Sequence, residues 1–465
     1  MTMLIDGALV SSADSFAVIN PADETVVGHA PDCTKAQMEE AFAAAQRAFP
    51  DWAARHPDQR RQALRACAEI LRAHADPLAR LLTLEQGKPL AKAKREIGGA
   101  ARWFEYTTEI EIPVETIAIQ GQKSVEVHRR PLGVVAAIVP WNYPVMTAVW
   151  KIAPALMAGN SVLLKPSPYT PLATLKLAEI LKDALPKGVL NILSGGDELG
   201  KWMCDHPTPR KIAFTGSTAA GKAVAAAAAR DLKRVTLELG GNDAAIVLDD
   251  ADPVKVGQAV FNAAFENSGQ VCVAVKRVYV PDRLYRPVVD QLVACANAAK
   301  LGSGLEPDTD MGPVNNRAQF ERVLDLIADA RGRGGVIAAG GDRKGNQGYF
   351  IEPSIVTDLP DDARLVAEEQ FGPALPVLRY RDVEEALERA NAGMFGLAGS
   401  VWGADEARAT AVAAKLQCGT AWVNQHLAMA PQAPIAGHKW SGIGVENGPW
   451  GLLAYTDMQV IEVAA

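Results

Sequence analysis

A single cysteine, Cys272, stands in a sequence setting suited to covalent chemistry. It follows the polar, glycine-containing segment Asn267–Val271, and a Glu-Leu-Gly-Gly run begins upstream at Glu238. An exposed thiol in such a turn is a nucleophile once ionised, and a carboxylate beside it can activate a water molecule. An isolated cysteine is more often a small buried apolar residue. The two motifs together favour chemistry through a thioester.

A glycine-rich segment, Gly216–Ala223, nearly matches the phosphate-binding pattern G-x-x-x-x-G-K-[ST]. Its last position is Ala223, which lacks the hydroxyl that holds Mg²⁺, so a nucleotidase is disfavoured. A strand ending at Phe214, this turn and the alanine-rich helix after it still predict a helix N-terminus that can hold a dinucleotide pyrophosphate. The G-x-G-x-x-G fingerprint of dinucleotide-binding folds is absent.

The composition is that of a globular protein with a large core. The 465 residues are 49% hydrophobic and 22% charged, which predicts two or three domains, and the net charge of −7 comes from mixed signs. We therefore expect no nucleic-acid partner. The six cysteines form no CxxC pair, and no His, Cys and acidic residues have metal-ligand spacing, so we expect a reducing cytoplasm and no metal. No signal peptide or membrane-length apolar run is expected.

Short apolar runs alternate with helical segments, which predicts parallel α/β sheets. A second series of alternating elements begins after Gly241, which predicts a second α/β domain. Helices are expected at 35–49, 57–85, 170–185, 253–265 and 284–300, and strands at 134–139, 161–166, 189–193, 211–214, 234–238, 244–248 and 277–280. Residues 116–130 alternate around Gly121 and read as a hairpin, and residues 458–463 form a strand with no local partner.

Six short motifs follow one another along the chain. They are Pro140-Trp141-Asn142-Tyr143-Pro144, Lys165-Pro166-Ser167, Phe214-Thr215-Gly216-Ser217, Glu238-Leu239-Gly240-Gly241, Gly269-Gln270-Val271-Cys272 and Glu368-Glu369-Gln370-Phe371-Gly372-Pro373. In the order and spacing of these motifs, the chain resembles the aldehyde dehydrogenase superfamily, and in particular its bacterial, NAD(P)⁺-dependent oxidising branch.

The resemblance implies a role for each catalytic residue. Cys272 would attack the aldehyde to give a thiohemiacetal, whose oxyanion would be held by the Asn142 side chain and the Cys272 backbone N–H. Hydride would then leave to the nicotinamide, and Glu238 would activate the water that hydrolyses the thioester. Lys151 and Glu446 match a supporting Lys and Glu, either in proton transfer or as an ordering ion pair.

The resemblance also implies a site for NAD⁺. Lys165 and Glu369 are expected on the adenosine ribose hydroxyls, Ser217 on the pyrophosphate, and Trp141 and Phe371 beside the nicotinamide half. Where many NAD-preferring members have a ribose-binding Glu, this chain has Pro168, so NADP⁺ also remains possible. The other expected cofactor residues are Ile138, Val139, Pro140, Ser167, Gly196, Gly216, Leu239 and Gly240.

For the substrate, the resemblance implies a mostly apolar tunnel. Its expected lining is Tyr143, Trp150, Glu266, Val271, Val273, Leu427, Met429 and Ile435. With Glu266 as the one charge and no Arg at the pocket positions, a neutral aliphatic or aromatic aldehyde is expected, and a carboxylate-bearing one should be repelled. A semialdehyde or a cationic amino-aldehyde is the alternative. His426 and His438 are expected to be structural or solvent-facing rather than bases.

We expect an aldehyde dehydrogenase-like architecture: a Rossmann-like cofactor domain over 1–114 and 132–240, and a catalytic domain over 241–440. A small β element, 115–131 with 441–465, should add its last strand to a neighbouring subunit in a homodimer or homotetramer. The less favoured alternatives are a CoA-acylating dehydrogenase, in which the motif Glu is usually lost, and a non-enzymatic structural protein.

Overall fold

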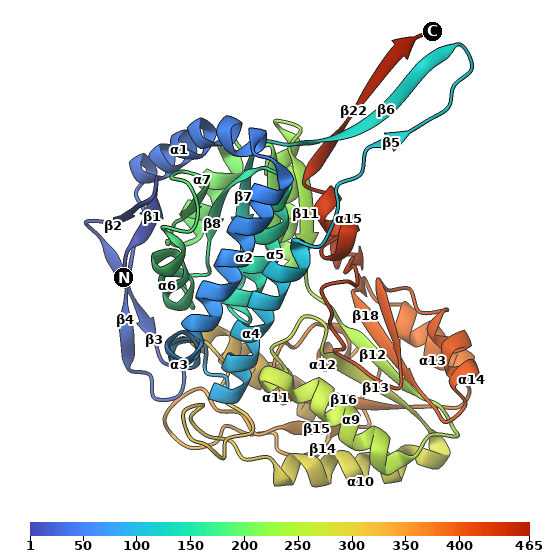
Figure 1. The fold of residues 1–465 in the computed structure, drawn as a ribbon. Coiled ribbons are helices and arrows are strands. Elements are labelled where there is room, and N and C mark those ends of the chain that lie inside the picture. Colours follow the sequence, from blue (N-terminus) through green and yellow to red (C-terminus); the bar gives the residue numbers. More distant parts are fainter.

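Apolar runs bounded by turn residues form the strands of two separate sheets, and a third, narrow sheet projects from the body (Figure 1). The computed structural model describes all 465 residues. The expected fold class, two α/β units with a small β element, is confirmed. No helix combines the length and apolar character needed to cross a membrane.

The first sheet has eight strands, of which the five central ones are parallel and buried between helices. In spatial order the strands are β2 (Ala8–Val10), β1 (Met3–Ile5), β9 (Leu190–Ile192), β8 (Ser161–Lys165), β7 (Val134–Ile138), β10 (Lys211–Thr215), β11 (Arg234–Glu238) and β21 (Gly442–Ile443). All five central strands were predicted from the sequence, whereas β1, β2 and β21, which pair antiparallel, were not.

Helices cover both faces of this sheet. One face carries α1 (Lys35–Ala54), α7 (Asp197–Asp205) and α8 (Thr218–Ala229); the other carries α5 (Pro144–Met157) and α6 (Leu172–Leu181), with α2 (Pro57–Ala73), α3 (Ala75–Gln86) and α4 (Leu90–Thr107) outside them. The single helix predicted over 57–85 is two helices. It breaks at His74, which leaves helical geometry at ψ 18° and whose ring lies 2.9 Å from the Ile70 carbonyl.

The second sheet has seven strands, all parallel except β14 at its edge. Their spatial order is β14 (Val336–Ala339), β15 (Ser354–Thr357), β16 (Ala374–Tyr380), β13 (Val275–Pro281), β12 (Asp243–Val247), β18 (Ala398–Trp402) and β19 (Thr420–Val423). One face carries α9 (Pro253–Phe265) and α10 (Asp282–Ala298), and the other carries α11 (Arg317–Gly332), α12 (Arg364–Ala367), α13 (Val383–Asn391) and α14 (Glu406–Ala413). A short turn of 3₁₀ helix, η1 (Glu266–Gly269), follows α9.

The terminal strand β22 (Thr456–Ala464) pairs along its length with β6 (Gln122–Pro131), which also pairs with β5 (Glu115–Thr116) across the predicted hairpin turn. These three strands form the projecting arm in Figure 1. The segment before β22 does not join the arm. Strand β21 and helix α15 (Gly448–Leu453) pack on the first unit, although the sequence grouped them with the oligomerisation element.

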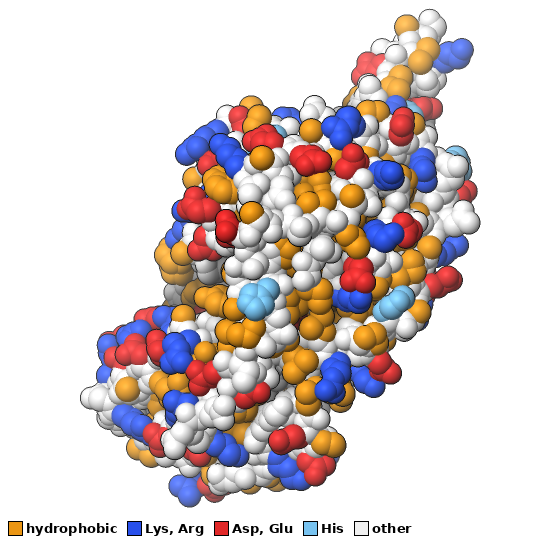
Figure 2. Space-filling model, turned by 90° about the vertical axis from the view of Figure 1, so that its left-hand side faces the viewer, with side chains coloured by type: hydrophobic (Ala, Val, Ile, Leu, Met, Phe, Trp, Pro, Cys, Tyr) orange, Lys and Arg blue, Asp and Glu red, His pale blue; other side chains and the backbone are white.

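The remaining strands form two small pairs: β3 (Ser15–Ile19) with β4 (Val26–Pro31), and β17 (Phe395–Gly396) with β20 (His438–Lys439). Figure 2 shows Lys, Arg, Asp and Glu side chains interspersed over one face, with apolar side chains gathered around its middle.

Candidate active site

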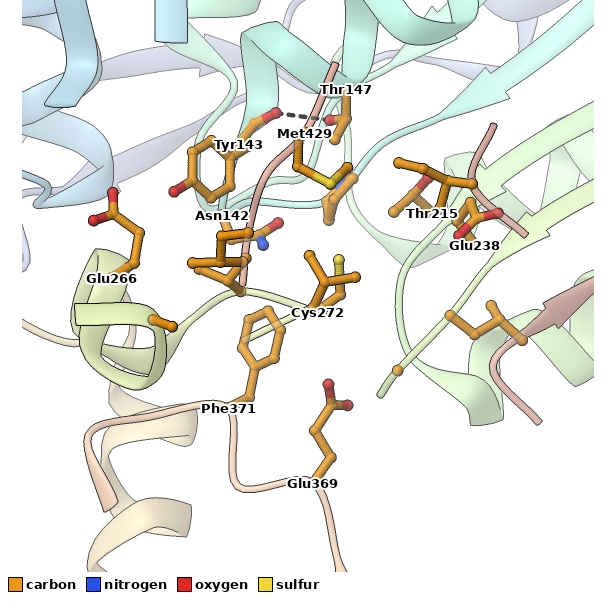
Figure 3. A pocket seen from close by; sticks show the side chains of 18 of the residues that line it. Asn142, Tyr143, Thr147, Thr215, Glu238, Glu266, Cys272, Glu369, Phe371 and Met429 are labelled. Carbon is orange, nitrogen blue, oxygen red and sulfur yellow. Dashed lines mark hydrogen bonds between the residues drawn. The ribbon is translucent and has the colours of Figure 1, made fainter. Parts of the chain in front are cut away.

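A cavity of about 1330 Å³ receives side chains from both α/β units. Cys272, Glu238 and Asn142 all line it, and Figure 3 shows Cys272 between Asn142 on one side and Glu238 on the other. All eight residues predicted for the substrate tunnel also line it: Tyr143, Trp150, Glu266, Val271, Val273, Leu427, Met429 and Ile435. The structure therefore brings the predicted nucleophile, its partners and the tunnel residues into one space.

The turn before Cys272 is a run of three residues in the left-handed conformation. The φ angles are 50° at Asn267, 57° at Ser268 and 75° at Gly269. Ser268 donates its hydroxyl to the Gly312 carbonyl at 2.7 Å. A Cβ on Gly269 would lie 2.3 Å from the Gly372 carbonyl oxygen, so glycine is required there.

Two buried side chains fix the backbone beside the thiol. Gln270 accepts the Asn315 N–H at 2.8 Å, and the Lys276 ammonium donates to the carbonyls of Val271 (2.6 Å) and Cys272 (3.1 Å). Burial raises the pKa of the Cys272 thiol to about 12, although the nearby Lys276 opposes the shift. The resting group at neutral pH is thus the thiol, and it must lose a proton before it attacks.

Asn142 is held with its amide beside the cysteine loop. Its Nδ2 donates to the Gln270 carbonyl at 2.9 Å, which uses one of its two N–H groups and leaves the other for an oxyanion. The backbone carbonyl of Asn142 accepts a hydrogen bond from the Lys88 ammonium at 2.8 Å. Lys88 is in turn paired with Glu96 at 2.5 Å, and Glu96 also accepts the first backbone N–H groups of α5. The sequence did not indicate Lys88, just before α4, or Glu96 within it, because nothing in this segment distinguishes them from surface charges.

Glu238 ends strand β11 as a buried carboxyl, and one of its oxygens has no hydrogen-bond partner. Burial raises the pKa of Glu238 well above its usual value; Glu446 adds to the shift and Lys151 opposes it. Lys151 and Glu446 form a fully buried ion pair, and they lie behind the cavity rather than on its wall. A carboxyl with a raised pKa and a free oxygen is suited to accept a proton from water.

Of the predicted cofactor residues, eight line the same cavity: Pro140, Trp141, Gly216, Ser217, Leu239, Gly240, Glu369 and Phe371. Ser217 caps helix α8 by accepting the Ala220 N–H, and the neighbouring Thr215 hydroxyl is buried without a partner. Trp141 and Phe371 meet edge to face with ring centroids 5.2 Å apart. A helix N-terminus, an unpaired hydroxyl and aromatic walls fit a dinucleotide.

The other five predicted cofactor residues, Ile138, Val139, Lys165, Ser167 and Gly196, do not line this cavity. They gather at the carboxyl edge of the first sheet, where Val139 N–H donates to the Lys165 carbonyl at 3.0 Å and Gly196 precedes α7. Burial lowers the pKa of Lys165 to about 8, and Asp197 opposes the shift. Glu369, by contrast, lines the cavity and accepts the Gly241 N–H at 3.0 Å. Lys165 and Glu369 therefore do not line the same cavity.

The charges in the tunnel differ from the expectation. Glu266 is not a lone anion, because Lys92 of α4 donates to it at 2.6 Å. Arg95, one turn further along α4, also lines the cavity, so the expectation of no Arg at the pocket is wrong. Nothing in the sequence of α4 indicates this role, because its side chains reach the tunnel only when the two units come together.

Trp103 of α4 is another lining residue that the sequence did not indicate, and its ring stacks on that of Trp150 at 5.6 Å. His426 lies between the Ser400 hydroxyl (2.9 Å) and the Val273 carbonyl (2.8 Å), and burial lowers its pKa to about 3. Its ring therefore stays neutral at physiological pH, and both of its nitrogens are occupied. His438 is exposed on β20.

Comparisons with known proteins agree on one family. The model of the aldehyde dehydrogenase family matches residues 9–461. The chain is 38% identical over 482 residues to a phenylacetaldehyde dehydrogenase of Pseudomonas fluorescens, covering 99% of this chain and 95% of the relative. An NAD⁺ complex of an aldehyde dehydrogenase from Bacillus cereus superposes with a TM-score of 0.98 at 37% identity, covering 100% and 96% of the two chains.

An NADP-dependent enzyme of E. coli also superposes with a TM-score of 0.98, at 36% identity and with 100% and 98% of the chains covered. Identities above one third over nearly complete chains, the same fold and the matched motifs all lead to one assignment. The chain belongs to the aldehyde dehydrogenase family, as its six motifs predicted.

Proposed function

We propose that this enzyme oxidises a neutral aliphatic or aromatic aldehyde to its carboxylic acid through a thioester on Cys272. The observation that carries the proposal is that a thiol, a side-chain amide with a free N–H and a buried carboxyl with a free oxygen line one cavity. These are the three groups that acyl chemistry of this kind requires: a nucleophile, an oxyanion donor and a general base.

Each step follows from the placement of these groups. The Cys272 thiolate attacks the carbonyl carbon, and the resulting oxyanion accepts hydrogen bonds from Asn142 Nδ2 and the Cys272 N–H. Trp141, Phe371 and the start of α8 at Ser217 would hold NAD⁺ or NADP⁺, which would supply the acceptor for the hydride that leaves the thiohemiacetal carbon, so that a thioester remains on Cys272. Glu238 takes a proton from water, whose oxygen attacks the thioester carbon and releases the acid and the cysteine sulfur. The buried pair of Lys151 and Glu446 tunes the basicity of Glu238.

For the cofactor, NAD⁺ is the proposed partner and NADP⁺ is also accepted. The unpaired Thr215 hydroxyl and the start of α8 at Ser217 support a pyrophosphate at that end of the cavity. A Cβ on Gly240 would lie 2.3 Å from a Glu369 oxygen, so the carboxylate packs directly on this backbone. The matches to an NAD⁺ complex and to an NADP-dependent enzyme support both cofactors.

The apolar part of the tunnel lining supports an uncharged substrate. Trp103, Tyr143, Trp150, Leu427 and Met429 surround the approach to the thiol, and apolar walls disfavour a group that must keep its water. The relative that acts on phenylacetaldehyde supports an aromatic aldehyde. A panel of aldehydes followed at 340 nm with NAD⁺ and NADP⁺ tests the proposal. Phenylacetaldehyde should exceed succinic semialdehyde in kcat/KM by about tenfold or more, about 1.4 kcal/mol, and the reverse order would refute it.

We also propose that the enzyme is a cytoplasmic homodimer or homotetramer. All six cysteines are free, which supports a reducing compartment. Strand β22 has one unpaired edge, and Met458, Val460 and Val463 are 67%, 54% and 44% exposed on it. Removal of residues 456–465 should then yield monomers by light scattering; an unchanged mass would show that the arm is not the interface.

A further inference from the structure

The Lys92–Glu266 ion pair is the one place in the aldehyde half of the cavity where opposite charges face each other at its wall. The Lys92 Nζ and Glu266 Oε2 atoms are 2.6 Å apart, and the side chains are 20% and 28% exposed. Lys92 comes from α4 of the first unit and Glu266 opens η1 of the second. Figure 3 shows Glu266 and Glu238 on opposite sides of Cys272.

Two other cations, Lys88 and Arg95, lie near Lys92 along the chain. Lys88 is buried, donates to Glu96 and to the Asn142 backbone carbonyl, and does not line the cavity, so it is not available to a substrate. Arg95 lines the cavity, is exposed and forms no ion pair. Lys92, Arg95 and Glu266 therefore give the cavity lining one unbalanced positive charge, and that charge is on Arg95, the most exposed of the three side chains.

We propose that the Lys92–Glu266 pair makes the enzyme select against charged aldehydes, because each partner compensates the charge of the other. This inference rests on the proposed oxidation of neutral aldehydes and extends it to specificity. A carboxylate that approaches Lys92 is repelled by Glu266 at the same point, and a cation that approaches Glu266 is repelled by Lys92. At the pair, a charged substrate must compete with a partner already held at hydrogen-bond distance, while an uncharged one leaves the pair intact. Arg95 has no partner, but its charge is exposed and screened by solvent, so it adds only a weak preference for an anion.

Removing the charge of either partner should change the preference between anionic and cationic aldehydes, and the two removals should act in opposite directions. In Glu266→Gln, Lys92 and Arg95 remain as two cations, which favours an anionic aldehyde. In Lys92→Met, Glu266 loses its partner, but Arg95 remains in the lining of the same cavity, so the gain for a cationic aldehyde should be smaller than the gain for the anion in Glu266→Gln. Because the sites are partly solvated, both gains should shrink with added salt.

The test uses charged aldehydes beside uncharged ones of the same shape. Succinic semialdehyde is compared with 4-methylpentanal, and betaine aldehyde with 3,3-dimethylbutanal, each as a ratio of kcat/KM values, so that general losses of activity cancel. Glu266→Gln should raise the anionic ratio about tenfold, Lys92→Met should raise the cationic ratio and lower the anionic one, and the double variant should return both toward wild type. Lys94→Met, which removes the same charge from α4 in an exposed pair with Asp76, is the control and should move neither ratio.

Ratios that change less than about threefold in both single variants, or that move in the same direction, would overturn the proposal. Lys92→Arg keeps the charge and should keep the wild-type ratios, which separates loss of charge from loss of packing. Failure of the proposed function looks different, because wild type would then oxidise neither 4-methylpentanal nor 3,3-dimethylbutanal.

Discussion

Lys151 and Glu446 form a buried ion pair whose two members move the pKa of Glu238 in opposite directions. Glu446 reaches this position because β21 pairs with β11, the strand that ends at Glu238. Lys211 is also buried nearby, where burial lowers its pKa to about 7 against the pull of Glu446. Glu238, the proposed general base, therefore lies beside buried charges at positions 151, 211 and 446, which are far apart in the chain.

The first prediction concerns the pH dependence of thioester hydrolysis. Glu238 works as a base when it is deprotonated, so the rate rises with pH through its pKa. Glu446→Gln removes a cause that raises this pKa, and the acid limb of kcat should move to lower pH. Lys151→Met removes the opposing cause, and the limb should move to higher pH. Shifts of the same sign in the two variants would contradict the assignment of Glu238 as the base.

The second prediction concerns the nucleophile. Cys272→Ala should lower aldehyde oxidation to less than about a hundredth of wild type, because no thioester can form, while NAD⁺ binding by calorimetry is retained. In wild type without cofactor, a pKa of about 12 predicts that alkylation of Cys272 by iodoacetamide accelerates steadily from pH 7 to pH 10. Cys418→Ala is the control, and a plateau near pH 7 would show that the resting group is already a thiolate.

The third prediction separates the two halves of the reaction. Glu238→Gln keeps the side-chain shape and loses the base, so it should give one burst of NAD(P)H per site in stopped flow. Steady-state turnover should fall on the order of 10²-fold, because thioester hydrolysis becomes limiting. The acyl group should then be detectable on Cys272 by mass spectrometry, and normal turnover would assign Glu238 a structural role only.

The parts of the fold that the sequence predicted are those with a strong local signal. Four of the five central strands of the first sheet contain short apolar runs, and the fifth, β11, alternates polar and apolar residues; both patterns indicate strands without any tertiary information. The Cys272 turn was recognisable for the same reason, since its glycine and polar residues are contiguous. The edge strands β1, β2 and β21 have two or three residues each and, unlike the equally short β9, do not lie within a mostly apolar five-residue run between turn residues, so neither a run nor a periodicity shows.

The parts that were missed depend on contacts across long stretches of chain. Lys92 and Glu266 are 174 residues apart, and Lys151 and Glu446 are 295 residues apart. Glu446 was placed only through the family resemblance. Lys92 has no such motif, and its charge is indistinguishable in sequence from the solvated charges elsewhere on α4. Burial and partner are properties of the packed units, so only the structure revealed that Glu266 is compensated.

The last prediction concerns the choice between NAD⁺ and NADP⁺. Pro168 follows the buried Lys165 at the end of β8 and is half-buried, so it places no charge where the resemblance expects the adenosine ribose. Pro168→Glu would add a carboxylate there, which can accept hydrogen bonds from ribose hydroxyls and repels a 2′-phosphate. The ratio of kcat/KM for NADP⁺ to that for NAD⁺ should fall about tenfold or more, with most of the change in the KM for NADP⁺. Pro168→Gln has the same length without the charge and is the matched control, so its ratio should fall much less. Equal ratios in wild type and Pro168→Glu would place the ribose away from β8 and remove Lys165 from the cofactor site.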